Sequence, residues 1–394
     1  SYFRDHDPEY QKLQAKLTRS EAVLKGFETH KITTVSIMEE MPEPRDTFIL
    51  DRGAYDHPKT EEKLSPSTFS ALPAMAEDLP RNRLGLAEWL LSAEHPLTSR
   101  VAVNRYWQML FGAGLVRTPE DFGSQGELPT HRELIDWLAV EFRESGWDVK
   151  AMLKLIVTSS TYRQSSVVDS TLQARDPENR LLARGPRFRL NGQALRDQVL
   201  AVSGQLNPKI GGLPVMPYQP TGLWEEVSAK GVKYIEAKGE DLYRRSLYTF
   251  WRRTVPPPSM MNFDNSTREN CSVASTRTNT PLQAMNLLND PQYVEAARLL
   301  AQRMMLEGGD SLESQIDYGH RLVLARSPHD RVAQILTKGY RDYLAAFQEK
   351  PADAGSLLSV GEKPAAENLD PVKLAAMSAV AGVLLNLDET LTKE

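Results

Sequence analysis

The sequence is poor in cysteine, because its 394 residues contain a single one, Cys271. One cysteine excludes a disulfide bond within the chain, and the absence of CxxC and CxxCH motifs excludes a structural zinc knuckle and covalently attached haem in this portion. Long apolar runs are also missing, since none approaches the roughly 20 residues that cross a bilayer. We therefore expect no cofactor and no membrane-spanning segment in this chain.

A strong charge of either sign is missing as well. The 47 Lys and Arg residues and 52 Asp and Glu residues leave a net charge of −5. This balance gives no basic footprint for nucleic acid or for an anionic membrane surface, so we expect no nucleic-acid partner. The first residue is Ser1 rather than Met, so we expect a processed or trimmed part of a longer product, and the missing signal peptide says nothing about the compartment.

Short catalytic motifs are equally scarce. The seven histidines form no HxH, HExxH or HxxxH pattern, and there is no GxSxG motif for a serine nucleophile. The pair Gly211-Gly212 lacks the spacing and the lysine of a phosphate-binding loop. Local spacing therefore predicts no metal site, although ligands that converge from distant positions stay open.

Helical periodicity dominates what is present, so we predict a mainly α fold, a multi-helix globular unit. Short β-rich runs, at 32–38 and 47–50, predict a small β element near residues 31–52. Apolar and aromatic residues set among paired arginines, such as Tyr248 and Trp251, predict short strands near 232–252. We divide the chain into an N-terminal helix, β element and extended connector, a helical core with a central polar loop at 256–280, and a C-terminal helical part; the segments are 1–79, 80–306 and 307–394.

The central polar loop is the expected site. Residues 256–258 are three prolines that force an extended path, and 262–279 is rich in Asn, Ser, Thr and charged residues. Two helix starts close it, Thr280-Pro281 and Asp290-Pro291, each pairing a capping residue with proline at the first helical position. Long irregular loops are usually functional or disordered, and the aromatic residues that flank this loop favour an ordered one.

Three residues of this loop are candidates for catalysis. Asp264 and Glu269 could act as general acid and base, and Cys271 could act as a nucleophile in its charged surroundings. The alternative is that Cys271 is a small packed side chain and that the acids pair with neighbouring cations. Five residues apart in a loop, the two carboxylates have no defined separation.

Four residues are candidates for ligand binding. Arg268 and Arg277 offer guanidinium forks for carboxylate, phosphate or sulfate, and Asn279 stands beside a helix N-terminus. Trp224 could stack on a sugar ring. The alternative is that the arginines pin the loop to the core and that the tryptophan belongs to that core.

Several long stretches together resemble the C-terminal DUF1553 (PSD1) region of large planctomycete proteins. One of them is RTNTPLQAMNLLNDPQYVEAA at 277–297, which holds the candidate loop's end. With the runs at 39–56 and 383–394, the resemblance covers nearly the whole chain; its other stretches are 82–139, 145–166, 178–204 and 243–254.

The resemblance implies where such a protein is found and which domains accompany it. The family has no established activity, so the resemblance identifies no catalytic residues. Such proteins are typically exported and often have a cytochrome c-like domain and a DUF1549 region upstream, so the resemblance implies an extracytoplasmic location and haem only in an upstream domain. We hypothesise a binding or scaffolding module that holds a polysaccharide or a partner subunit. The alternatives are a carbohydrate-active enzyme on complex or sulfated polysaccharide, and a module that docks a cytochrome c-like domain for electron transfer.

Overall fold

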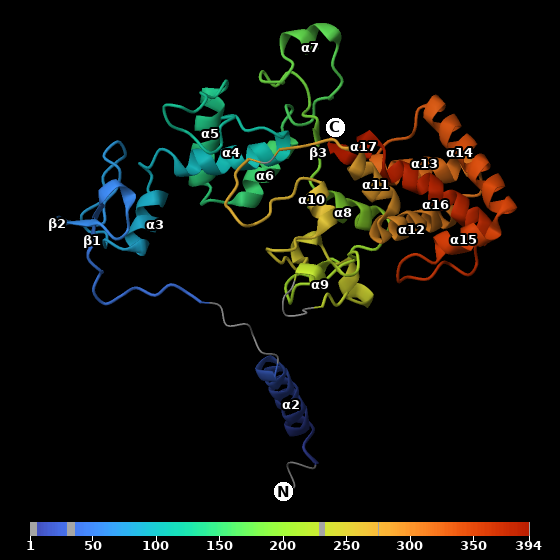
Figure 1. Ribbon diagram of the computed structural model, residues 1–394, viewed down its shortest axis with the longest axis horizontal. Coiled ribbons are helices and arrows are strands. Elements are labelled where there is room, and N and C mark those ends of the chain that lie inside the picture. Colours follow the sequence, from blue (N-terminus) through green and yellow to red (C-terminus); the bar gives the residue numbers. More distant parts are fainter. Residues whose placement is uncertain (1–5, 30–35, 228–232, 275, 394) are drawn as a thin grey trace. The chain divides into compact units, whose positions relative to one another are not determined.

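The computed structural model describes residues 6–29, 36–227, 233–274 and 276–393, and its described part is mainly helical (Figure 1). The helices confirm the fold class predicted from the sequence. Contacts divide the chain into two units, residues 1–89 and 90–394. The finer division into three segments stays a prediction.

The first unit contains a helix and a two-stranded hairpin. Helix α2 spans Pro8–Thr29, and strand β1, Thr47–Leu50, pairs antiparallel with β2, Pro58–Leu64. A short 3₁₀ turn, Asp51–Gly53, joins the strands, and helix α3 follows at Arg83–Leu91.

The small β element was predicted only in part. Strand β1 is where we expected it, but the other predicted run, at 32–38, lies mostly outside the described residues and its last three form no strand. The partner of β1 is β2, in the segment interpreted as an extended connector. Strand β2 is exposed along its whole length, so it lacks the alternation of apolar and polar residues that marks a half-buried strand.

The second unit begins with a three-helix cluster made of α4, Thr98–Phe111, α5, Arg132–Glu144, and α6, Val149–Thr158. Their apolar faces meet in one core, where the rings of Trp107 and Phe111 stack with centroids 4.0 Å apart. This cluster fixes the end of α4, which borders the cavity described below.

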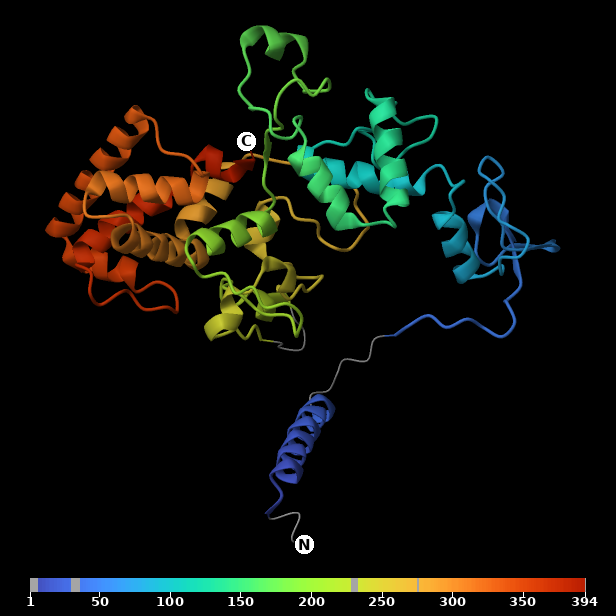
Figure 2. The ribbon, with the colours of Figure 1, turned by 180° about the vertical axis from the view of Figure 1, so that it is seen from behind.

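A larger helical core follows in the chain. Helices α12 and α16 pack against each other along their length, and both views of the ribbon show them side by side among the surrounding helices (Figures 1 and 2). Both helices carry fully buried alanines, such as Ala301 on α12 and Ala375 on α16, and small side chains of this kind allow close packing. The helices of this core are α8, Gly192–Val202; α11, Pro281–Asn289; α12, Pro291–Glu307; α13, Leu312–Leu324; α14, Asp330–Glu349; α15, Pro351–Leu358; and α16, Pro371–Leu385.

Short elements connect these two cores. Strand β3, Phe188–Arg189, pairs antiparallel with β4, Thr392–Lys393, and so joins the middle of the chain to its C-terminal end. The other short elements are α7, Ser170–Arg175; α9, Leu223–Val227; the 3₁₀ turns Gly239–Tyr243 and Ser246–Tyr248; α10, Pro258–Asn262; and α17, Asp388–Leu391.

The prediction of short strands near 232–252 is wrong for the residues that the structure describes there. They form two 3₁₀ turns and isolated bridges, such as Val215 with Thr249. The carbonyls of Leu242 and Arg244, which a strand would use for its ladder, instead accept hydrogen bonds of 2.9 and 2.8 Å from the buried guanidinium of Arg196.

Both predicted helix starts after the polar loop are confirmed. Thr280 and Gln283 form a capping box at the start of α11, and the Asp290 carboxylate accepts a 2.9 Å hydrogen bond from the backbone N–H of Gln292 in α12. Helix α10, Pro258–Asn262, occupies the start of the predicted polar loop, and the rest of the loop lies between α10 and α11. Among the described residues, every helix is too short or too polar to span a lipid bilayer.

Candidate functional site

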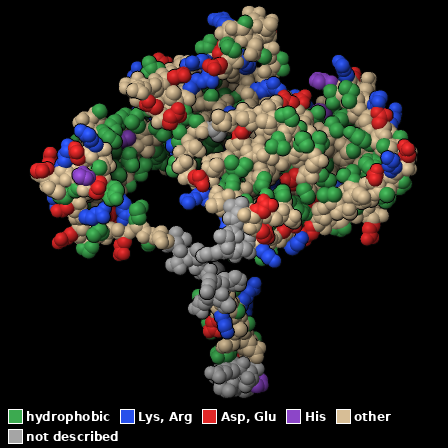
Figure 3. Space-filling view, viewed as in Figure 1, with side chains coloured by type: hydrophobic (Ala, Val, Ile, Leu, Met, Phe, Trp, Pro, Cys, Tyr) green, Lys and Arg blue, Asp and Glu red, His purple; other side chains and the backbone are tan. Residues whose placement is uncertain are grey.

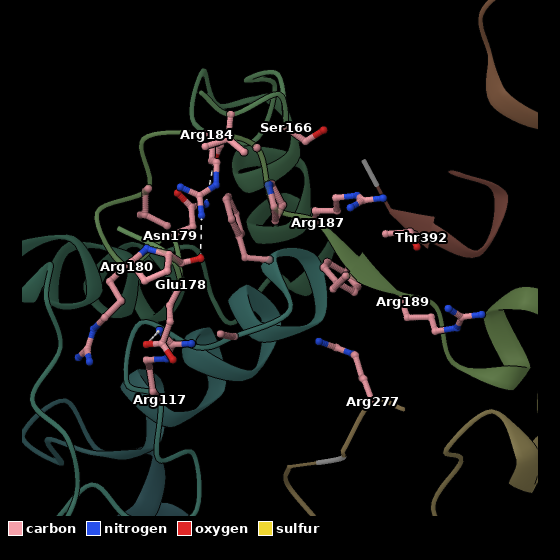
Figure 4. A pocket seen from close by; sticks show the side chains of 18 of the residues that line it. Arg117, Ser166, Glu178, Asn179, Arg180, Arg184, Arg187, Arg189, Arg277 and Thr392 are labelled. Carbon is pink, nitrogen blue, oxygen red and sulfur yellow. Dashed lines mark hydrogen bonds and ion pairs between the residues drawn. The ribbon is translucent and has the colours of Figure 1, made fainter. Parts of the chain in front are cut away.

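An open cavity of about 620 Å³ lies in the second unit where the three-helix cluster, strand β3 and the end of the polar loop meet. We name it the arginine cavity, because six arginines line it against two carboxylates, Glu178 and Asp388. Figure 4 shows these arginines around the cavity, with Arg277 reaching in from the side opposite Arg184. The six are Arg117, Arg180, Arg184, Arg187, Arg189 and Arg277.

Close backbone packing at the end of α4 shapes one wall. Gly112 ends this helix with φ of 82°, in the left-handed region. A Cβ atom at this position would lie 2.7 Å from the ring of Phe188 and 3.0 Å from the guanidinium of Arg277. Glycine is therefore needed both for the backbone conformation and for the approach of these two cavity residues.

Asp176 and Arg184 hold the loop on the opposite wall. The Asp176 carboxylate accepts hydrogen bonds of 2.8 Å from the backbone N–H groups of Arg180 and Leu181, and Arg184 donates to the carbonyls of Asp176 and Pro177, both at 2.9 Å. Burial alone would raise the pKa of Asp176, but these backbone hydrogen bonds and the charges of nearby arginines bring it below its ordinary value. The wall is thus fixed by bonds that need the ionised carboxylate.

Two residues of this wall have backbone conformations that L residues rarely adopt. Asn179 has φ of 51° and Leu182 has φ of 55°. Asparagine tolerates the left-handed region, and its side chain donates a 2.9 Å hydrogen bond to the carbonyl of Arg184, but leucine gains nothing there. Such strain is retained where surrounding contacts enforce it, which often occurs at functional sites.

Several of the cavity arginines form ion pairs with carboxylates. Arg117 contacts Glu178 at 3.0 Å, and Arg180 turns to Glu127 at 2.9 Å. On strand β3, Arg187 forms an ion pair with Asp388, and Arg189 lies 4.0 Å from the same carboxylate. Asp388 is therefore shared by two arginines.

Arg189 retains unused donor capacity. Its side chain is only 14% exposed, and its Nε atom is buried without a hydrogen-bond partner in the described chain. A buried donor of this kind loses its hydration with no compensation, so an anion that reached it would be bound favourably.

Two of the predicted ligand-binding residues, Arg277 and Asn279, line the arginine cavity. Arg277 donates a 2.9 Å hydrogen bond to the carbonyl of Gly112, and its guanidinium lies 4.5 Å from the ring centroid of Phe188. Burial lowers the pKa of Arg277 from its ordinary value. The structure thus anchors this guanidinium at one edge and leaves its charge within the cavity.

The other two predicted ligand-binding residues lie elsewhere. Arg268 packs its guanidinium over the ring of Trp251, 4.5 Å from the centroid, and lines neither the arginine cavity nor the cavity beside it. Trp224 is buried in contact with Tyr234 and Phe250, so it has no free face for a sugar.

The three catalytic candidates do not come together in one cavity. The Asp264 carboxylate accepts hydrogen bonds from the backbone N–H and the hydroxyl of Thr278, at 2.6 and 2.9 Å. Glu269 lies at the surface, 3.8 Å from Arg253, and Cys271 is an exposed free thiol. Asp264 therefore braces the loop, and the described residues show no base beside Cys271.

Sequence reasoning missed most of the cavity. Four of the cavity arginines, Arg180, Arg184, Arg187 and Arg189, come from the stretch RLLARGPRFRL, whose density of arginine was a usable signal in a chain with net negative charge. The remaining partners, Arg117 and Asp388, are far away in sequence, and nothing local marks them. Over the described residues, no group of three or more His, Cys, Asp or Glu is placed to hold a metal ion.

Fold and cavity together define a mainly helical protein with a cationic cavity. A family model described as PSD1, protein of unknown function (DUF1553), matches residues 82–340, and the chain belongs to this family. Comparison with curated proteins and with solved structures gives no match. The matched region contains all of the arginine cavity except the residues of its C-terminal edge, Asp388 and Thr392.

Proposed function

We propose that this chain is a binding module for acidic polysaccharide, with the arginine cavity as its site. The observation that carries the proposal is that six arginines and two carboxylates line one open cavity, in a chain whose net charge is −5. Acidic and basic side chains are otherwise interspersed over the face in Figure 3. A local concentration of cations against that background favours a specific anionic ligand.

The chemistry of the lining favours carboxylate or sulfate groups. Guanidinium groups bind such anions through two parallel hydrogen bonds, and they do so best when their orientation is fixed beforehand. Arg277 is fixed by Gly112 and Phe188, and Arg189 by its burial. A cavity of about 620 Å³ is larger than one inorganic anion needs and has room for sugar units that carry the charges.

Binding is better supported than hydrolysis. Glycoside hydrolases use two carboxyl groups at a defined separation, one of which must take or give a proton. Of the two acids predicted for this role, Asp264 accepts hydrogen bonds from Thr278, and Glu269 faces Arg253 at the surface. The acids of the arginine cavity, Glu178 and Asp388, are each held in an ion pair with an arginine of the same cavity.

A second candidate is docking of a partner protein, including a cytochrome c-like domain. Helix α11 leaves three apolar side chains exposed at a spacing of three residues, Leu282, Met285 and Leu288, at 55, 59 and 51%. Residues at this spacing share one helix face, and an exposed apolar face is typical of a protein contact. Both candidates include the extracytoplasmic location that the family resemblance implies.

A thermal-shift experiment on the full chain separates the two candidates. The probes are a heparin-derived hexasaccharide, a hexagalacturonate and the neutral cellohexaose. A ligand at about 100 times its Kd adds roughly 2.7 kcal/mol to the free energy of unfolding, so at least one acidic probe should raise the melting temperature and the neutral probe should not.

Two variants make the result specific to the cavity. Arg187→Gln removes an exposed cavity arginine and should reduce the shift, whereas Arg132→Gln removes an arginine that is 86% exposed on α5 and should leave it unchanged. No shift with either acidic probe, or equal loss in both variants, would contradict the proposal.

A further inference from the structure

A second cavity of about 620 Å³ adjoins the arginine cavity. Phe188, Arg189 and Arg277 line both, so strand β3 and the end of the polar loop form the border between them. The polar loop contributes Asp264 and Val273 to the second cavity and Asn279 to the arginine cavity. The segment that the sequence marked as the site therefore borders both.

The lining of the second cavity is chemically different from that of the first. It combines polar and charged residues with a set of aromatic and aliphatic side chains, among them Met109, Leu110, Tyr162, Leu190 and Phe263. These apolar side chains suit the apolar faces of sugar rings, while the polar groups beside them fix orientation.

Two further cations border this apolar surface, Arg105 from α4 and Lys393 from β4. The ammonium of Lys393 lies 4.2 Å from the ring centroid of Tyr162, and neither cation forms an ion pair with a carboxylate in the described part of the chain. The carboxylate that lines this cavity, Asp264, accepts hydrogen bonds from Thr278. Positive charge is therefore left over here too.

We propose that the two cavities form one extended site, which binds a linear acidic oligosaccharide across the border made by Phe188, Arg189 and Arg277. The first cavity holds its anionic groups between several arginines. The second holds the continuing chain against its apolar wall, with one more anionic group near Arg105 and Lys393. This inference rests on the proposed function and adds to it a requirement for chain length.

The test compares two lengths of one repeat, a heparin-derived disaccharide and hexasaccharide, titrated calorimetrically into the full chain. We expect the hexasaccharide to bind at least about tenfold more tightly, because contacts in the second cavity become intramolecular once the first is occupied. The double variant Arg105→Gln, Lys393→Gln should lower the affinity for the hexasaccharide toward that of the disaccharide and leave the disaccharide affinity unchanged.

A matched double variant controls for the loss of two charges. Arg331→Gln with Lys373→Gln changes two exposed cations that line neither cavity, and it should leave both affinities unchanged. Equal affinities of the two lengths, or a loss of disaccharide affinity in the Arg105 and Lys393 variant, would overturn the extended site. Failure of every acidic oligosaccharide to bind would instead remove the proposed function itself, so the two failures are distinguishable.

Discussion

The guanidinium of Arg277 lies over the ring of Phe188, 4.5 Å from its centroid, and these two residues line both cavities. One comes from strand β3 and the other from the end of the polar loop, nearly 90 residues later in the sequence. This contact joins the segment that the sequence marked as the site to the arginines that it did not mark.

Arg277→Gln should weaken the binding of the heparin-derived hexasaccharide about tenfold to hundredfold. The expectation follows from about 1.5–3 kcal/mol for a hydrogen bond to a charged group, with about 1.4 kcal/mol for each factor of ten. Isothermal titration measures it. Arg277→Lys should recover only part of the loss, because an ammonium keeps the charge and lacks the planar fork. A Kd equal to that of the unsubstituted chain in Arg277→Gln would contradict the role given to this residue.

Asp388→Asn should tighten the binding of the same probe several-fold. The carboxylate of Asp388 now faces Arg187 and Arg189, and an anionic ligand must compete with it for both. Asp136→Asn is the matched control, since Asp136 contacts Arg100 at 2.7 Å outside the cavity and its loss should leave affinity unchanged. Weaker binding in Asp388→Asn would indicate that this carboxylate supports the site rather than competing for it.

The stability of the cavity wall should depend on pH through Asp176. A carboxyl group whose pKa is lower in the folded chain than its ordinary 3.8 stabilises the fold above that value, and the contribution is lost as pH falls through the folded pKa. Asp176→Asn should therefore lower the free energy of unfolding at pH 7 by about 1 kcal/mol or more, the typical net value of a hydrogen bond. Urea unfolding of both chains at several pH values measures the difference.

The lowered pKa of Asp176 determines how the stability difference between the two chains must change with pH. The difference between the two chains should shrink only at acidic pH, below about 3.8, and should be constant between pH 6 and 8. A difference that grows on acidification would contradict the lowered pKa of Asp176.

Glu295→Gln should be strongly destabilising. Glu295 is fully buried and accepts hydrogen bonds from the hydroxyl groups of Tyr218 and Tyr243, at 3.0 and 2.9 Å, and from the backbone N–H of Lys363, at 2.7 Å. Its carboxylate also lies 3.8 Å from the buried guanidinium of Arg298. Removing one partner of a buried ion pair costs about 3–5 kcal/mol, because the other charge is left uncompensated.

Thermal unfolding of Glu295→Gln measures this cost. Glu367→Gln, at an exposed position, is the control and should melt within a degree or two of the unsubstituted chain. A small effect in Glu295→Gln would mean that the core around α12 does not depend on this ion pair.

Local signals predicted the elements that local chemistry determines. Thr280-Pro281 and Asp290-Pro291 predicted the starts of α11 and α12, since a capping side chain and a proline act within one helical turn. The same reasoning failed near residue 244, because Arg196, a residue distant in sequence, takes the carbonyl groups that a strand would have used. Tertiary contacts of this kind leave no periodic trace in the sequence.

The candidate site was predicted at one edge only. Arg277 and Asn279 were found because they stand beside a helix start in a polar loop, and both line the arginine cavity. The end of α4 brings Arg117 to the cavity, and the pairing of β3 with β4 brings Arg187 and Asp388 there. That pairing joins two-residue strands about 200 residues apart, a contact too short to have a recognisable pattern.

The most direct test of the account is the salt dependence of hexasaccharide binding to the full chain, measured by titration calorimetry between 50 and 300 mM NaCl with and without Arg187→Gln. If arginines of the cavity bind a polyanion, log Kd should rise linearly with log salt concentration as counterions are released, and the variant should show weaker binding and a smaller slope. Binding that is independent of salt, or a slope that is unchanged when Arg187 is removed, would contradict the arginine cavity as an anion-binding site.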